Sequence, residues 1–179
     1  MMDNSFFAYL QQLELMAFFS AYPLIYTVSF FIAGNPSGTN IFKKRILPLI
    51  SYSYAFTGTL YLGLQIRNLY PDYSIESISI AVTHPWLTGW GLLSLLFWIP
   101  ALSRRPILSL VHSLVIFFLL AKDLFLHTVQ SSADRNVVKN DMKIYTDSIL
   151  LNLGSLIAIV IISLLIAKFK SRKASSLMP

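Results

Sequence analysis

Five long apolar runs, separated by short polar connections, limit what this 179-residue chain can fold into. A helix needs about 20 mainly apolar residues to cross the hydrocarbon core of a bilayer. Inside that core the backbone must satisfy its own hydrogen bonds, which a helix does along its length. The runs therefore predict an all-α integral membrane protein, a compact bundle of five transmembrane helices. The expected spans cover about residues 15–34, 46–66, 86–102, 107–129 and 148–169.

The composition agrees with a membrane protein and excludes several other classes. Hydrophobic residues make up 55% of the chain and charged residues only 12%, against about 25% charged residues in soluble domains. No polar linker divides the sequence, so residues 1–179 should form a single membrane domain. The net charge of +6 does not indicate nucleic-acid binding, because the basic residues form short clusters beside apolar runs. The absence of cysteine excludes disulfides and Cys-ligated metal centres.

Basic residues predict the orientation. They follow the first, third and fifth runs, and positively charged connections stay on the cytoplasmic side. The N-terminus is therefore expected outside and the C-terminus inside, and all eight acidic residues then lie at or beyond the outer boundary. Anionic lipid should gather at the inner basic clusters. These clusters contain Lys43, Lys44, Arg45, Arg104, Arg105, Lys168, Lys170, Arg172 and Lys173.

Connection lengths add detail to this topology. The segment 103–106 is so short that the spans at 86–102 and 107–129 should form an antiparallel hairpin. The two outer connections, residues 67–85 and 130–147, are longer than a turn requires. Because the chain carries no eukaryotic targeting signal, we expect it in a bacterial cytoplasmic (inner) membrane.

The second span carries a ridge of small side chains at every fourth position. Such ridges let helix backbones approach closely. We expect the ridge to pack on another helix, of this chain or of a partner; lining a substrate cavity is the alternative. The ridge consists of Ser51, Ala55, Thr59 and Gly63. A smaller cluster that could dock against it consists of Asn152, Gly154 and Ser155.

Ionisable residues inside or near the spans are candidates for a polar site, because they are costly at membrane depth. His112 falls within the fourth span. A neutral, hydrogen-bonded histidine packed between helices is the simpler interpretation, and a proton relay or ligand is the alternative. Asp123 lies near the outer end of the same span, four residues before His127, so the two could pair on one helix face.

A second hypothesis concerns a cofactor. His84 and His127 are both expected near the outer face, where the antiparallel spans at 86–102 and 107–129 could bring them together, although His84 falls in the connection before Pro85. Two imidazoles on facing helices can ligate a b-type haem, or a metal with Asp123 as a third ligand. The residue spacing that is diagnostic of such sites is absent.

No arrangement of nucleophile, base and acid is visible, so we expect the chain not to be an enzyme. Few internal polar groups and the small-residue ridges favour a non-catalytic integral subunit, or an assembly partner, of a larger membrane protein complex. One alternative is a haem b-binding redox subunit that uses His84 and His127. Another is a small transporter or channel that uses Asp123, His112 and a kink at Pro23, because proline disrupts a helix interior.

Overall fold

The computed structural model describes residues 4–34, 46–70, 85–129 and 135–175, and every secondary-structure element in these ranges is a helix. Within these ranges, three stretches are long and apolar enough to cross a membrane. The described part of the chain is therefore all-helical, with three candidate membrane-spanning helices, while the five spans, their orientation and the hairpin stay predictions. The three stretches are Gln11–Ala33, Pro106–Leu126 and Met142–Lys170.

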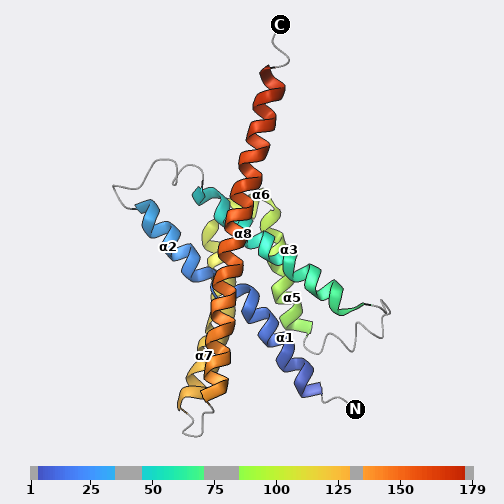
Figure 1. The fold of residues 1–179 in the computed structure, drawn as a ribbon, viewed down its shortest axis with the longest axis vertical. Helices are drawn as coiled ribbons and strands as arrows, with labels where there is room; N and C mark the ends of the chain where they lie inside the picture. Colours follow the sequence, from blue (N-terminus) through green and yellow to red (C-terminus); the bar gives the residue numbers. More distant parts are fainter. Residues whose placement is uncertain (1–3, 35–45, 71–84, 130–134, 176–179) are drawn as a thin grey trace.

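The described elements form five successive passes that run in alternate directions, and some passes contain more than one element. The elements are, in chain order, α1 (Asn4–Phe19), α2 (Tyr22–Gly34), η2 (Leu47–Leu49), α3 (Ile50–Asn68), α5 (Pro85–Leu93), η3 (Ser94–Trp98), α6 (Pro100–Ser103), α7 (Pro106–Val129) and α8 (Arg135–Ser175). In Figure 1 the chain rises through α1 and α2, descends through α3, and rises again through α5, η3 and α6. It then descends through α7 and rises through α8, so the start of α1 and the end of α8 lie at opposite ends of the picture.

The first predicted span is broken in its middle. α1 ends at Phe19 and α2 begins at Tyr22, so Ser20 and Ala21 lie between the two helices. Pro23 has no N–H group to donate to the carbonyl four residues earlier, and it is tolerated in the first turn of a helix. The disruption expected from Pro23 thus takes the form of a break just before it.

The third predicted span is not one helix. α5 gives way to the tighter turns of η3, and Ile99 then adopts an extended conformation with φ −73° and ψ 122°. The reason is Pro100, because proline disfavours helical geometry in the residue before it. The short α6 starts at Pro100. The second predicted span, in contrast, is the continuous helix α3, which is rich in Ser, Thr and Tyr.

Aromatic side chains form much of the core. The Phe19 ring packs edge-on against Tyr54 and Tyr61, with ring centroids 5.5 Å apart in each pair. Tyr22 and Tyr54 are closer, at 4.3 Å. α3 approaches η3 so closely at Gly58 that a Cβ atom there would overlap Ser94 Oγ. These contacts bring α1, α2, α3 and η3 together in the centre of the molecule.

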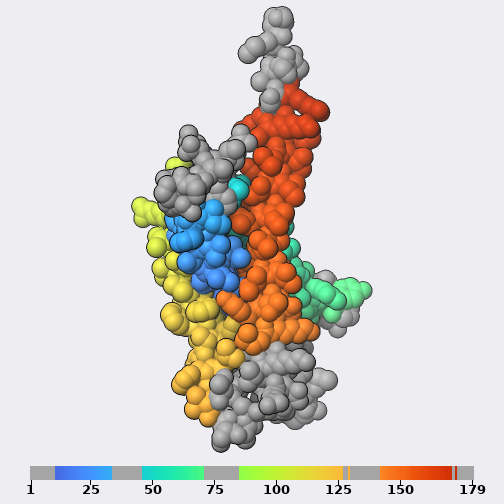
Figure 2. Space-filling view, turned by 60° about the vertical axis from the view of Figure 1, so that its left-hand side comes forward, coloured from blue at the N-terminus to red at the C-terminus, as the bar shows by residue number. Residues whose placement is uncertain are grey.

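α8 extends beyond the rest of the bundle. Its 41 residues correspond to about 60 Å of helix, and its C-terminal part stands clear of the other helices in Figures 1 and 2. Only 17% of an 18-residue apolar segment of α8 is buried, compared with 50% of a segment of the same length across α1 and α2. Most of the apolar surface of α8 therefore faces outward.

Candidate functional site

His112, on α7, lies against α3, α5 and η3, where aromatic rings from all three elements surround its imidazole. The Trp90 indole stacks on its imidazole, with ring centroids 4.8 Å apart and planes 3° from parallel. Tyr54 and Phe97 approach the same ring edge-on, at 5.7 Å and 6.1 Å. The imidazole is thus enclosed by aromatic side chains on several sides.

Both ring nitrogens of His112 are engaged. Nε2 lies 3.0 Å from the backbone carbonyl oxygen of Trp90, which can only accept, so Nε2 carries the proton. Nδ1 accepts a hydrogen bond from the Tyr54 hydroxyl at 2.6 Å. The Trp90 indole N–H in turn donates to the backbone carbonyl of His112 at 3.3 Å. This geometry is that of a packed, neutral histidine, and ligating a metal or relaying a proton requires one of these bonds to break.

A second set of polar contacts lies at the start of α7. The Tyr22 hydroxyl lies 2.8 Å from Ser109 Oγ. Tyr22 also lies within hydrogen-bond distance of the backbone carbonyl of Ile50, at 3.3 Å, and Ser109 of that of Pro106, at 2.7 Å, so either hydroxyl can be the donor of the pair. Tyr22 and Ser109 are both buried. These bonds connect α2 to α7 without leaving either hydroxyl unpaired.

Two side chains of α8 form hydrogen bonds with the backbone at the break between α1 and α2. The backbone N–H of Ala21 donates to Ser148 Oγ at 3.1 Å, and Asn152 Nδ2 donates to the backbone carbonyl of Phe18 at 2.8 Å. Backbone polar groups at membrane depth need such partners, because lipid offers none. Ser148 and Asn152 are one helical turn apart and both are buried. They replace hydrogen bonds that a continuous helix would make itself.

The sequence pattern did not identify these two residues as partners of the break. It assigned Asn152 to a cluster facing the second span, and it omitted Ser148. The spacing of Ser148, Asn152 and Ser155 places all three on one helix face, which is the signal that could have found them.

Several buried oxygen atoms lie in this region without a hydrogen-bond partner among the described residues. Ser20 Oγ is in the break itself, and Asn152 Oδ1 and Ser155 Oγ are on the α8 face that packs there. A buried polar atom without a partner costs about 1–3 kcal/mol, and ordered water is the usual partner. The break is therefore a buried region with polar atoms that the described part of the protein does not satisfy.

Two carboxylates take part in hydrogen bonds between α1 and its neighbouring helices. Glu14 accepts hydrogen bonds from Gln65 at 3.1 Å and from Asn68 at 3.2 Å, both on α3. Asp123 on α7 accepts from the amide of Gln12 at 2.5 Å. Glu14 and Asp123 therefore join helices to one another rather than simply facing water. Neither role was visible in the sequence, since the amide partners are distant along the chain.

The small-residue ridge on α3 is buried along part of its length. Ser51 and Ala55 are buried, whereas Thr59 and Gly63 are exposed. A Cβ atom at Gly63 would meet nothing within 4 Å, and Thr59 accepts a hydrogen bond from the Trp98 indole at 3.0 Å. Close helix approach within this chain thus occurs at Gly58, beside the predicted ridge, and packing of Thr59 and Gly63 on a partner stays a prediction.

The proposed histidine pair lies outside the described residues. His84 falls in the undescribed segment 71–84, and the side chain of His127 is not described although its backbone belongs to α7. Among the described residues, no group of three His, Asp or Glu side chains is placed to hold a metal ion. The haem and metal hypotheses stay predictions.

No family model, curated protein or solved structure matches this chain. Its function must therefore be inferred from its own residues and their geometry.

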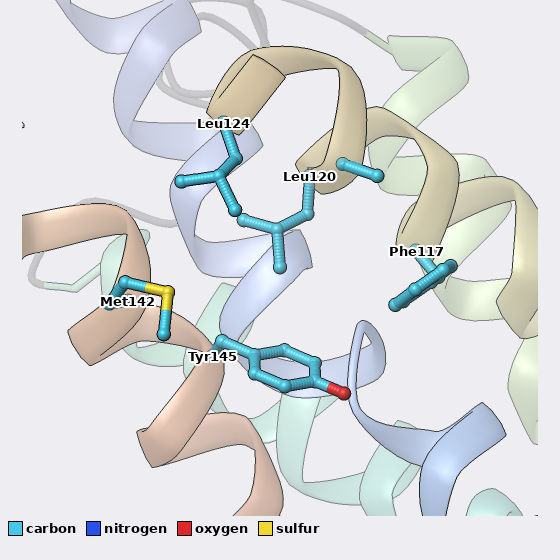
Figure 3. Close-up of a pocket in the computed structure, with 6 residues that line it drawn as sticks. Phe117, Leu120, Leu124, Met142 and Tyr145 are labelled. Atoms are coloured by element: carbon cyan, nitrogen blue, oxygen red, sulfur yellow. The ribbon is translucent and has the colours of Figure 1, made fainter. Parts of the chain in front are cut away.

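One cavity of about 260 Å³ lies between α7 and α8. Figure 3 shows Leu120 and Leu124 projecting from α7 toward Met142 and Tyr145 on α8. Phe117 and Ala121 complete the lining. Apart from the Tyr145 hydroxyl these side chains are apolar, so the cavity suits an apolar side chain or an acyl chain and provides no catalytic group.

Proposed function

We propose that this chain is a non-catalytic integral subunit, or an assembly partner, of a larger membrane protein complex. The observation that carries the proposal is the bare apolar surface of α8. Only 17% of an 18-residue apolar segment within Met142–Lys170 is buried against the rest of the chain. Large exposed side chains follow it to its end, including Ile157, Ile161, Leu165 and Phe169.

One face of α8 has the composition of a helix-packing surface. Gly154, Ala158, Ile161 and Leu165 are spaced four, three and four residues apart, so they lie on one side of the helix. Gly154 is exposed, and a Cβ atom there would meet nothing within 4 Å. Two small residues four apart let a second helix approach closely. Lipid chains cover apolar side chains without needing such a pair, which favours a protein partner at this face.

The interior supports a structural role as well. His112, Ser148 and Asn152 each bond groups on other helices. The carboxylate of Glu14 accepts hydrogen bonds from α3 amides. These polar side chains hold the helices of this chain together, as we expect in a subunit that presents a fixed surface to a partner.

Substitution at Gly154 tests the proposal. Gly154→Ile adds a side chain where this chain has open space, so it should leave the isolated protein folded and displace a partner helix. Gly89→Ile is the matched control, because Gly89 on α5 is also exposed with nothing within 4 Å of its Cβ position and lies outside the predicted ridge. After purification from the native host in mild detergent, mass spectrometry of the intact assembly should detect a stoichiometric partner with the wild type and with Gly89→Ile.

The same partner should be lost from Gly154→Ile while its melting temperature stays unchanged. A wild-type protein that purifies as a homogeneous monomer would contradict the proposal. Equal loss from both glycine variants would contradict the assignment to this face.

A small transporter or channel is the second candidate, and the break between α1 and α2 favours it. Interrupted membrane helices with unpaired polar groups are used by transporters to bind ions and substrates near mid-membrane. Ser20 Oγ and Asn152 Oδ1 are buried polar atoms of that kind. Flux of small ions into proteoliposomes should then fall in Asn152→Leu. Absence of flux with the wild type would exclude the ions tested.

A further inference from the structure

A second cavity, of about 370 Å³, lies where η2, α3, α6 and α7 meet. Its lining combines apolar side chains with two hydrogen-bond donors, Tyr52 and Arg104. The remaining lining residues are Leu47, Pro48, Ser103 and Pro106. The cavity is thus different in chemistry from the apolar one between α7 and α8.

The cavity lies at the edge of a candidate membrane span. Pro106, one of its lining residues, is the first residue of the apolar stretch that ends at Leu126. Arg104 and Arg105 immediately precede that stretch and both are exposed. In a bilayer this boundary coincides with the headgroup region, where lipid phosphates lie.

The donors at this cavity are available. Among the described residues, no acidic side chain forms an ion pair with the Arg104 guanidinium, and none accepts a hydrogen bond from the Tyr52 hydroxyl. Ser103 Oγ, by contrast, is already bonded to the backbone carbonyl of Pro100. The N-terminal end of α7, which starts at Pro106, adds a partial positive charge.

We propose that this cavity binds one anionic phospholipid, with its phosphate held by Arg104 and Tyr52 and its glycerol and first acyl carbons against Leu47, Pro48 and Pro106. A guanidinium matches a phosphate with two parallel hydrogen bonds. The apolar walls suit the part of a lipid next to the phosphate, which a free phosphate ion does not have. This site is independent of the α8 surface, so it does not depend on the proposed subunit role.

The test compares two neighbouring arginines. Arg104→Gln and Arg105→Gln remove the same charge from adjacent exposed positions, but only Arg104 lines the cavity. The purified chain is reconstituted in nanodiscs of phosphatidylcholine with increasing phosphatidylglycerol, and the bound lipid is measured by mass spectrometry after release into detergent. The wild type and Arg105→Gln should retain one phosphatidylglycerol. Arg104→Gln should bind it about tenfold more weakly, the size expected for loss of a charge-assisted hydrogen bond.

Two further arms distinguish a seated lipid from a free anion and from diffuse surface charge. Tyr52→Phe should weaken retention less than Arg104→Gln, because it removes a neutral donor. Inorganic phosphate should not displace the lipid. Equal loss in Arg104→Gln and Arg105→Gln would mean diffuse attraction to an anionic surface and would overturn the proposal. Equal retention of phosphatidylcholine, or displacement by inorganic phosphate alone, would overturn it too.

Discussion

The two halves of α8 have different relations to the rest of the molecule. In the first half, Ser148 and Asn152 are almost completely buried and bond to the backbone of Ala21 and Phe18. In the second half, from Ile157 onward, most of the large apolar side chains are exposed. Within one helix, two polar side chains therefore face the interior while most large apolar side chains of the second half face outward, which is unusual for a helix in a water-soluble protein.

This difference shows where the stability of the bundle resides. In lipid, apolar surface gains little by facing other helices, so packing and internal hydrogen bonds must hold the helices together. The first half of α8 provides such hydrogen bonds, and the second half provides exposed apolar surface. Stability should therefore depend on the few buried polar side chains of the first half, and association on the exposed face that starts at Gly154 and continues through the second half.

The largest effect is expected from the double substitution Ser148→Ala with Asn152→Leu. It leaves the N–H of Ala21 and the carbonyl of Phe18 without partners, at about 1–3 kcal/mol each. Unfolding in detergent should show a loss of about 2–5 kcal/mol in the free energy of unfolding. The control is Ile161→Ala with Leu165→Ala in the exposed half, which should change this free energy little. Similar losses in both double variants would remove the distinction between the two halves.

A smaller effect is expected at His112, which extends the comparison from α8 to α7. His112→Phe keeps a ring against Trp90 but removes the acceptor of Tyr54 and the donor to the Trp90 carbonyl. The unfolding free energy should fall by about 2 kcal/mol. Tyr54→Phe, which removes one of these bonds, should cost less. Unchanged stability together with lost flux in proteoliposomes would instead assign His112 a functional role.

The smallest effect on stability is expected in the exposed half of α8. Ile161→Cys should change the melting temperature very little, because Ile161 is exposed. The chain has no native cysteine, so a thiol-reactive cross-linker will report this position alone. Cross-linking to a second protein in native membranes should be efficient at Ile161 and weak at a Cys placed at the buried Ile159. Equal cross-linking at both positions would contradict a single binding face.

The sequence predicted the helical class well and the continuity of the helices less well. Hydrophobicity marks a segment as apolar whether or not its backbone is unbroken. The third run was therefore extended across Pro100, where the structure has an extended residue just before the proline. Pro23 signalled a disruption correctly, since the chemistry of proline is local. The backbone groups that this disruption leaves without helical hydrogen bonds find their partners on α8, more than 100 residues away along the chain. The local sequence around Pro23 does not reveal those partners.

The candidate site was only partly visible in the sequence for the same reason. His112 was recognisable as a residue that needs partners at membrane depth. Its partners Trp90 and Tyr54 come from elements 22 and 58 positions away, and their selection depends on how the helices pack. The small residues of the ridge on α3 recur with the correct helical period. Periodicity identifies a helix face, but it does not show how much of that face a neighbouring helix contacts. A Cβ atom at Gly63 would meet nothing within 4 Å, so contact of the ridge within this chain ends before that residue.

The hydrogen bonds from α8 to the α1–α2 break also have a consequence for the synthesis of the chain. Ala21 and its partner Ser148 are 127 residues apart. At a synthesis rate of about 5–20 residues per second, Ser148 emerges about 6–25 s after Ala21. During that interval the Ala21 N–H and the Phe18 carbonyl have no partner on α8. The hydrogen bonding of the α1–α2 break is thus completed by a helix that is made much later.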